Sequence, residues 1–219
     1  MPGKNCAPDK DVRDKFSGRC LILISFGALT YFHRVSTVLT IDIQIRNQGN
    51  HMISDAMEKA LFDQLNHEFN SAYLYLAMSA YCSHLEFNGA AGWLKLQYEE
   101  EHMHATKIYN YLVEQGVHVI LKQLSQPPSD YGSVLDVFIA SLQHEQNMTA
   151  RLNDLSDQAL KEKDHATYNL LQWFVNEQVE EEATVGGIIS KLKLVKDDGY
   201  GLLMIDNELG SRSALQPVP

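Results

Sequence analysis

The sequence predicts an all-α protein, a four-helix bundle with one long crossover and a short fifth helix. Apolar residues recur at spacings of three and four in four separate segments, which is the period of one helix face. The three connections between these segments are short, long and short, so the first and last pairs form antiparallel hairpins and the middle connection crosses the bundle. With 219 residues, 45% of them hydrophobic, the chain is long enough to bury one sizeable core.

The first two helices form the first hairpin. We expect a helix over about 54–86, with Ser54 or Asp55 as its cap, because both residue types accept hydrogen bonds from free backbone amides. Asn88-Gly89 then breaks the chain and caps a second helix over about 89–115. So short a connection predicts that the two helices lie antiparallel.

A long connection and a second hairpin follow. Residues 117–132 contain two consecutive prolines and have no room for a long helix. Ser133 with Asp136 forms a capping-box pattern that opens a third helix, about 134–161. After a short turn, in which Asp164 is a candidate cap, we expect a fourth helix over about 165–195 and a short last helix over about 202–209.

The first helix is apolar beyond its core stripe, where a surface helix of a monomer has a polar back face. This pattern fits either an irregular edge of the core or a contact with another subunit, and we favour the subunit contact. The extra apolar residues are Leu74, Leu76, Ala77, Met78 and Tyr81.

Each of the four core stripes carries metal-type ligands about halfway along its helix. An ionised carboxylate that faces a bundle core is costly unless it is paired or holds a metal, and four helices with this feature at matching depth predict a cation site. Carboxylates mixed with an imidazole suit iron or manganese, with zinc possible, and bridging carboxylates suggest two metals. The stripe residues are Glu68, the Glu-x-x-His pair Glu101 and His104, Glu145, and Glu181 with Gln178 beside it.

Charge and cysteine usage exclude several classes. Residues 1–51 hold seven Lys/Arg and four Asp/Glu, a net of +3, whereas residues 52–219 hold eleven and 24, a net of −13. The acidic part is a poor candidate for nucleic acid and a fair one for cations. Cys6, Cys20 and Cys82 form no CxxC pair, which argues against a disulfide scaffold, a zinc ribbon or a rubredoxin-type site.

Residues 1–51 form an atypical N-terminal extension. Its uncharged run, 21–32, has 12 residues, too short to span a bilayer as a helix, which takes about 20. The extension is either the product of a mis-called start, with translation beginning at Met52, or a targeting segment, or a true extension. A start at Met52 predicts a cytoplasmic protein without stable membrane association, and a genuine targeting segment predicts export or membrane targeting.

Residues 52–210 resemble the prokaryotic non-haem ferritins over the whole length of that family, with 211–219 as a flexible tail. The segments that carry the resemblance are DQLNHEFNSAYLYLAMSAYC (63–82), YEEEHMHATKIYNYL (98–112), QHEQNMTARLNDL (143–155) and KDHATYNLLQWFVNEQVEEE (163–182).

The resemblance implies three iron positions. It assigns Glu68, Glu101 and His104 to one iron of a ferroxidase centre, and Glu68, Glu145 and Glu181 to the second, with Gln178 as a supporting or bridging glutamine. Tyr75 and Trp173 match the aromatic pair beside this centre. A third iron position is matched by Glu100, Glu177, Glu180 and Glu181.

The implied function is iron storage and detoxification. Ferrous iron is oxidised with O₂ or H₂O₂ and kept as ferric mineral inside a homo-oligomeric shell of 24 subunits, with the short C-terminal helix at the four-fold axes. No haem is expected, because none of the seven methionines matches a haem ligand. The alternatives are a small di-iron enzyme with its own substrate and a structural protein with a vestigial site.

Overall fold

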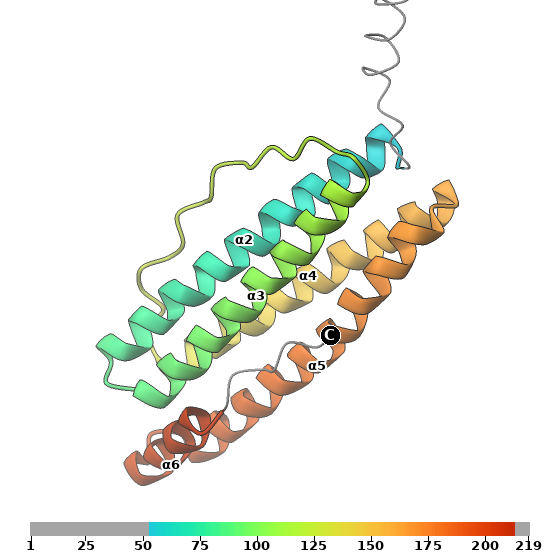
Figure 1. The fold of residues 1–219 in the computed structure, drawn as a ribbon. Helices are drawn as coiled ribbons and strands as arrows, with labels where there is room; N and C mark the ends of the chain where they lie inside the picture. Colours follow the sequence, from blue (N-terminus) through green and yellow to red (C-terminus); the bar gives the residue numbers. More distant parts are fainter. Residues whose placement is uncertain (1–52, 213–219) are drawn as a thin grey trace, which may run out of the picture. The chain divides into compact units, whose positions relative to one another are not determined.

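The structure, a computed structural model, describes residues 53–212, which form five helices and no strand (Figure 1). This confirms the predicted all-α fold. The helices are α2 (Asp55–His84), α3 (Asn88–Glu114), α4 (Val134–Glu162), α5 (His165–Val195) and α6 (Gly199–Gly210). None of these helices is long and apolar enough to cross a membrane. The predictions for residues 1–51 and for most of the tail lie outside the described residues.

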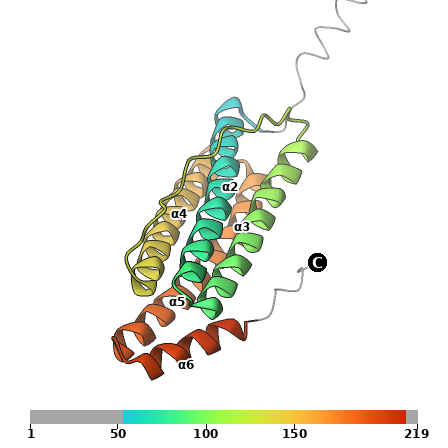
Figure 2. The ribbon, with the colours of Figure 1, turned by 90° about the vertical axis from the view of Figure 1, so that its left-hand side faces the viewer.

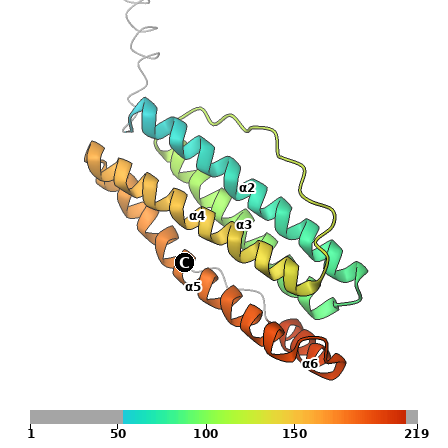
Figure 3. The ribbon, with the colours of Figure 1, turned by 180° about the vertical axis from the view of Figure 1, so that it is seen from behind.

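The four long helices form two antiparallel hairpins, α2 with α3 and α4 with α5 (Figure 1). Residues 115–133 run back along the outside of the bundle, so α3 and α4 are parallel (Figures 1 and 3). Polar contacts attach this crossover to α2: the Ser125 amide donates to Asn70 Oδ1 at 2.7 Å, and the Tyr81 hydroxyl donates to Asp130 Oδ1 at 2.9 Å. The long connection therefore produces the predicted bundle topology.

The predicted caps are present at α2, α4 and α5. The Ser54 hydroxyl accepts a hydrogen bond from the Met57 amide, Ser133 and Asp136 complete a capping box, and Asp164 accepts from the Thr167 amide. These side chains satisfy backbone amides that the first turn of a helix leaves without partners. Three helix starts are thus determined locally by the sequence.

The start of α3 differs from the expectation, because Phe87 occupies its cap position and makes no side-chain capping bond. The carboxylate of Asp206, on α6, accepts hydrogen bonds from the Gly89 amide at 3.0 Å and the Ala90 amide at 2.8 Å. Helix α6, which begins three residues earlier than predicted, lies across the end of the bundle and packs on α3 and α5 (Figure 2). The cap of α3 is therefore a tertiary contact.

The hydrophobic core is divided into two clusters. One surrounds Leu94 and Phe138 at the α6 end of the bundle, and the other surrounds Ile108 and Leu171 at the opposite end. Between the two clusters, each long helix carries at least one buried glutamate among other buried polar residues. The core is thus two apolar halves separated by a layer of carboxylates.

Candidate metal centre

The layer between the two core clusters is built by one glutamate from each long helix. Glu68 and Glu101 are each 1% exposed, Glu145 is fully buried and Glu181 is 7% exposed. His104, one turn beyond Glu101 on α3, joins them and is 3% exposed. The 3.6-residue period that places the neighbouring leucines in the core also directs these side chains inward.

Two groups of ligand atoms converge in this layer. One ligand atom from each of Glu68, Glu101 and His104 lies within 4.8 Å of the others, and Glu101, Glu145 and Glu181 form a second group by the same measure. The first group matches the set expected for one iron. The second group contains Glu101 in place of Glu68, which the resemblance had assigned to both irons. In the structure, Glu101 is therefore the glutamate shared by the two groups.

Hydrogen bonds orient two of these carboxylates. The Tyr75 hydroxyl donates to Glu145 Oε1 and lies 2.9 Å from the Ser141 hydroxyl. Gln178 Nε2 donates to Glu145 Oε2 at 3.0 Å, and Gln64 Nε2 donates to Glu68 Oε1 at 2.8 Å. Tyr75 and Gln178 thus contact an expected ligand, and Glu145 keeps a fixed orientation.

Several buried oxygens face the layer without a hydrogen-bond donor, namely Oε2 of Glu101 and both carboxylate oxygens of Glu181. Burial raises the pKa of Glu68 to about 7, and burial together with neighbouring carboxylates raises the pKa values of Glu101 and Glu181 well above the ordinary glutamate value. Unpartnered buried carboxylate oxygens are costly unless a cation compensates them. The donor set therefore fits two hard cations.

His104 is held as a neutral imidazole. Burial lowers its pKa to about 4, which leaves a lone pair free for a metal at neutral pH. Its ring makes edge contacts with Trp173 at 5.2 Å and Phe174 at 5.7 Å between centroids. The Lys107 ammonium also contacts Trp173, with Nζ 4.2 Å from the centre of the ring. The aromatic pair expected from the resemblance, Tyr75 and Trp173, therefore flanks the layer.

The residues expected at a third iron position line one cavity of about 560 Å³ beside the layer. Glu100 and Glu181 are buried in its wall, Glu177 is half-buried and Glu180 is exposed. Among the described residues, the ligand atoms of Glu100, Glu177 and Glu180 do not converge as the two groups in the layer do. These carboxylates therefore line the same cavity, but they do not surround a single metal position as the two groups in the layer do.

The sequence analysis did not find three residues beside the site: Gln64 and Arg212 contact expected ligands, and Ser141 contacts Tyr75. Gln64 precedes Glu68 by one helical turn and is fully buried, a position that the α2 stripe indicates. Ser141 precedes Glu145 by one turn in the same way and is also fully buried. Arg212, which pairs with Glu100, lies after the last helix, and no local pattern in the sequence points to it.

The Ferritin-like domain family matches residues 58–195, more than half of the chain. The chain belongs to the ferritin family. Curated relatives agree: the bacterial non-heme ferritin of Staphylococcus aureus (strain MRSA252) is 41% identical over 162 residues, which cover 74% of this chain and 98% of the relative. A probable bacterial non-heme ferritin-like protein of Haemophilus influenzae is 39% identical over the same shares of both chains.

Solved ferritins have the same fold. An open pore ferritin from the archaeon Archaeoglobus fulgidus superposes with a TM-score of 0.73 at 44% identity, covering 74% of this chain and 99% of that one. A humanized archaeal ferritin gives a TM-score of 0.74 at 41% identity, over 75% and 99%. Family membership supports iron storage as the general function, and the buried groups of carboxylates with His104 are compatible with iron binding.

Proposed function

We propose that this ferritin oxidises Fe²⁺ at a pair of positions in the carboxylate layer and stores the product as ferric mineral. The observation that carries the proposal is the pair of ligand groups that share Glu101. Glu68, Glu101 and His104 hold one ferrous ion, and Glu101, Glu145 and Glu181 hold the second. Hard carboxylate oxygens suit iron and stabilise the ferric state.

Protons held by the glutamates of the layer can supply those that the oxidation reaction consumes. The raised pKa values of Glu68, Glu101 and Glu181 favour the protonated forms of these groups when no cation is bound. Binding of Fe²⁺ displaces these protons, since metal ligands must be deprotonated. Two ferrous ions then give two electrons, which with two protons reduce O₂ to H₂O₂, or reduce H₂O₂ to water.

The cavity lined by Glu100, Glu177 and Glu180 receives iron after this step in the same proposal. Its carboxylates lie beside Glu181, which also belongs to the layer, so an ion leaving the layer has oxygen ligands along its path. The net negative charge of the chain, −10, attracts incoming Fe²⁺.

Assembly into a shell of 24 subunits is the structural part of the proposal. Large apolar side chains remain exposed on α2 and on the crossover, as a subunit contact requires. Tyr73 is 45% exposed, Leu76 38%, Ile120 65% and Leu121 61%. The solved relatives are ferritins that this chain matches over 99% of their length, which also supports a shell.

His104→Ala tests the proposed oxidation site. The variant loses the single imidazole in the layer, and we expect the initial rate of Fe²⁺ oxidation to fall by at least about tenfold, as loss of one metal ligand costs on the order of 1.4 kcal/mol or more. Stopped-flow absorbance of the ferric product measures this rate. His102→Ala is the matched control, because His102 lies two residues away on α3 and is exposed. Equal initial rates in wild type and His104→Ala would refute the assignment.

A further inference from the structure

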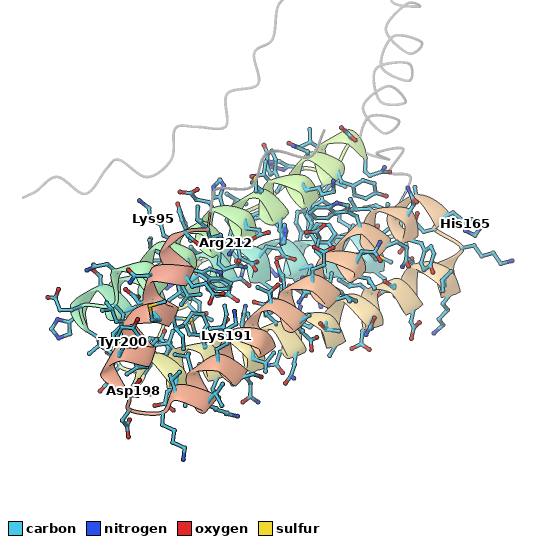
Figure 4. The ribbon with its side chains drawn as sticks, turned by 90° about the horizontal axis from the view of Figure 1, so that it is seen from below. Lys95, His165, Lys191, Asp198, Tyr200 and Arg212 are labelled. Atoms are coloured by element: carbon cyan, nitrogen blue, oxygen red, sulfur yellow. The ribbon has the colours of Figure 1, made fainter. Side chains whose placement is uncertain are left out.

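Arg212 places a positive charge in the cavity that the proposed third iron position occupies. It follows the last turn of α6, and its guanidinium lies against α3 (Figure 4). Its Nη2 donates to Glu100 Oε2 at 2.9 Å, and its Nη1 donates to Gln97 Oε1. The guanidinium carbon lies 4.8 Å from the centre of the Trp93 ring. Three side chains on one stripe of α3 thus hold this cation.

The partner of Arg212 is a carboxylate that needs a cation. Glu100 is 7% exposed, and among the described residues no other Lys or Arg forms an ion pair with it. A buried carboxylate without a counter-ion is costly, so the guanidinium supplies the compensation that iron would supply. A guanidinium bonded to Glu100 Oε2 repels a metal ion that approaches the same carboxylate and competes with it for the negative charge.

We propose that Arg212 is a displaceable counter-ion that holds Glu100 until a metal ion arrives at the third position. This inference rests on the third iron position of the proposed function. Metal binding moves the guanidinium away from Glu100 and from the Trp93 ring, and loss of the metal returns it. The occupancy of the third position is therefore set by competition between metal and Arg212.

Other contacts allow Arg212 to move without detaching α6. Asp206 caps the start of α3, and Ile205 and Leu209 of α6 are buried in the core cluster around Leu94 and Phe138. Neither contact involves Arg212, and the side chain of Arg212 is 22% exposed. Helix α6 stays docked by these two contacts while the guanidinium exchanges between Glu100 and solvent.

Arg212→Gln tests the competition in the full-length, assembled protein. The probe is Zn²⁺, which does not change oxidation state, and calorimetry measures the affinity for ions bound beyond the first two per chain. We expect Arg212→Gln to bind the third ion roughly tenfold more tightly, because the competing charge-assisted hydrogen bond is lost. Lys191→Gln is the matched control: it removes the same charge from the wall of the same cavity, where Lys191 is paired with Glu208 (Figure 4).

We expect Lys191→Gln to change the third affinity by less than about twofold, since an exposed ion pair contributes little. An equal gain in affinity for the third ion in both variants would show that the cavity responds only to its total charge. That result would overturn the proposal. A third ion that binds wild type and Arg212→Gln equally would overturn the counter-ion role alone. Absence of a third ion from wild type and from Arg212→Gln would refute the third position of the proposed function as well.

Tryptophan emission follows the displacement itself. The chain has two tryptophans, so a Trp173→Phe background leaves Trp93 as the reporter. We expect the third Zn²⁺ to shift Trp93 emission toward that of the Arg212→Gln variant on this background, because both changes remove the guanidinium from the ring. Binding of the third ion with unchanged Trp93 emission would overturn the proposal.

Discussion

At the scale of single residues, Glu68 shows the cost of a metal site inside an apolar core. The protonated form is the one that a buried, iron-free site tolerates, and burial raises the pKa of Glu68 from 4.5 to about 7. The folded chain therefore binds more protons than the unfolded chain between these two values. Stability of the iron-free protein falls as the pH rises from 4.5 to 7, and the loss is complete above 7.

Glu68→Gln removes this titration. We expect the melting temperature of the metal-free variant to exceed that of wild type by more at pH 8 than at pH 5, with a difference on the order of 3 kcal/mol in unfolding free energy. Calorimetry of chelator-treated protein at both pH values measures this. Melting curves that shift in parallel with pH in the two proteins would show that Glu68 does not carry the effect.

The sequence predicted the members of the carboxylate layer because a charged residue in an apolar stripe is conspicuous. Glu68 and Glu145 stand at the same depth on separate stripes, and a helix period suffices to bring them inward. Which glutamate belongs to both ligand groups depends on side-chain directions between helices, so Glu101 emerged only from the structure. Arg212 was not predictable, since its contact with Glu100 depends on how α6 crosses the bundle.

At the scale of elements, the contact between α6 and α3 depends on Gly89. A Cβ atom at this position would lie 1.7 Å from the backbone oxygen of Asp206, far closer than atoms can approach. Gly210 of α6 is also close to this position, since its Cβ would be 3.2 Å from the Gly89 Cα. Two glycines therefore allow the backbones to approach until Asp206 reaches the α3 amides.

Gly89→Ala should displace α6 from the bundle. We expect faster amide hydrogen exchange throughout α6 and at the start of α3, because the added methyl group separates the helices and removes the cap. Gly92→Ala is the matched control: it lies on the same helix with open space around it, and alanine stabilises a helix interior by about 0.5–1 kcal/mol relative to glycine. Unchanged exchange in α6 of Gly89→Ala would contradict the packing argument.

The long helices were predictable because local signals agree with the tertiary structure at both ends. Ser133 and Asp136 mark the start of α4 within four residues, and the structure begins that helix where predicted. The start of α3 was assigned to Asn88-Gly89, but its cap comes from Asp206, more than a hundred residues later in the chain. Local patterns hold no information about a cap supplied by another helix.

At the scale of the whole molecule, storage and simple di-iron catalysis differ in how much iron one particle keeps. The exposed apolar side chains of α2 and the crossover favour a large assembly, which storage requires. A small di-iron enzyme needs only the carboxylate layer. The two functions thus predict different particles from the same subunit fold.

Aerobic loading with excess Fe²⁺, followed by size-exclusion chromatography with protein and iron detected together, separates them. We expect iron far beyond two ions per chain to co-elute with a very large particle. Leu121→Arg, which charges a side chain 61% exposed on the crossover, should yield smaller particles that keep little iron while circular dichroism shows intact helices. About two irons per chain on a small wild-type oligomer would instead indicate a soluble di-iron enzyme.

The division of the core into two apolar halves links the lifetime of the protein to its cargo. The carboxylates between the two halves destabilise the native state when no cation is bound. Bound cations reverse this effect, since any ligand that binds only the native state stabilises it. Degradation that proceeds through transient opening follows the population of the open form. Under the proposed function, subunits in an iron-starved cell are removed fastest, and the abundance of the store follows the supply of the metal.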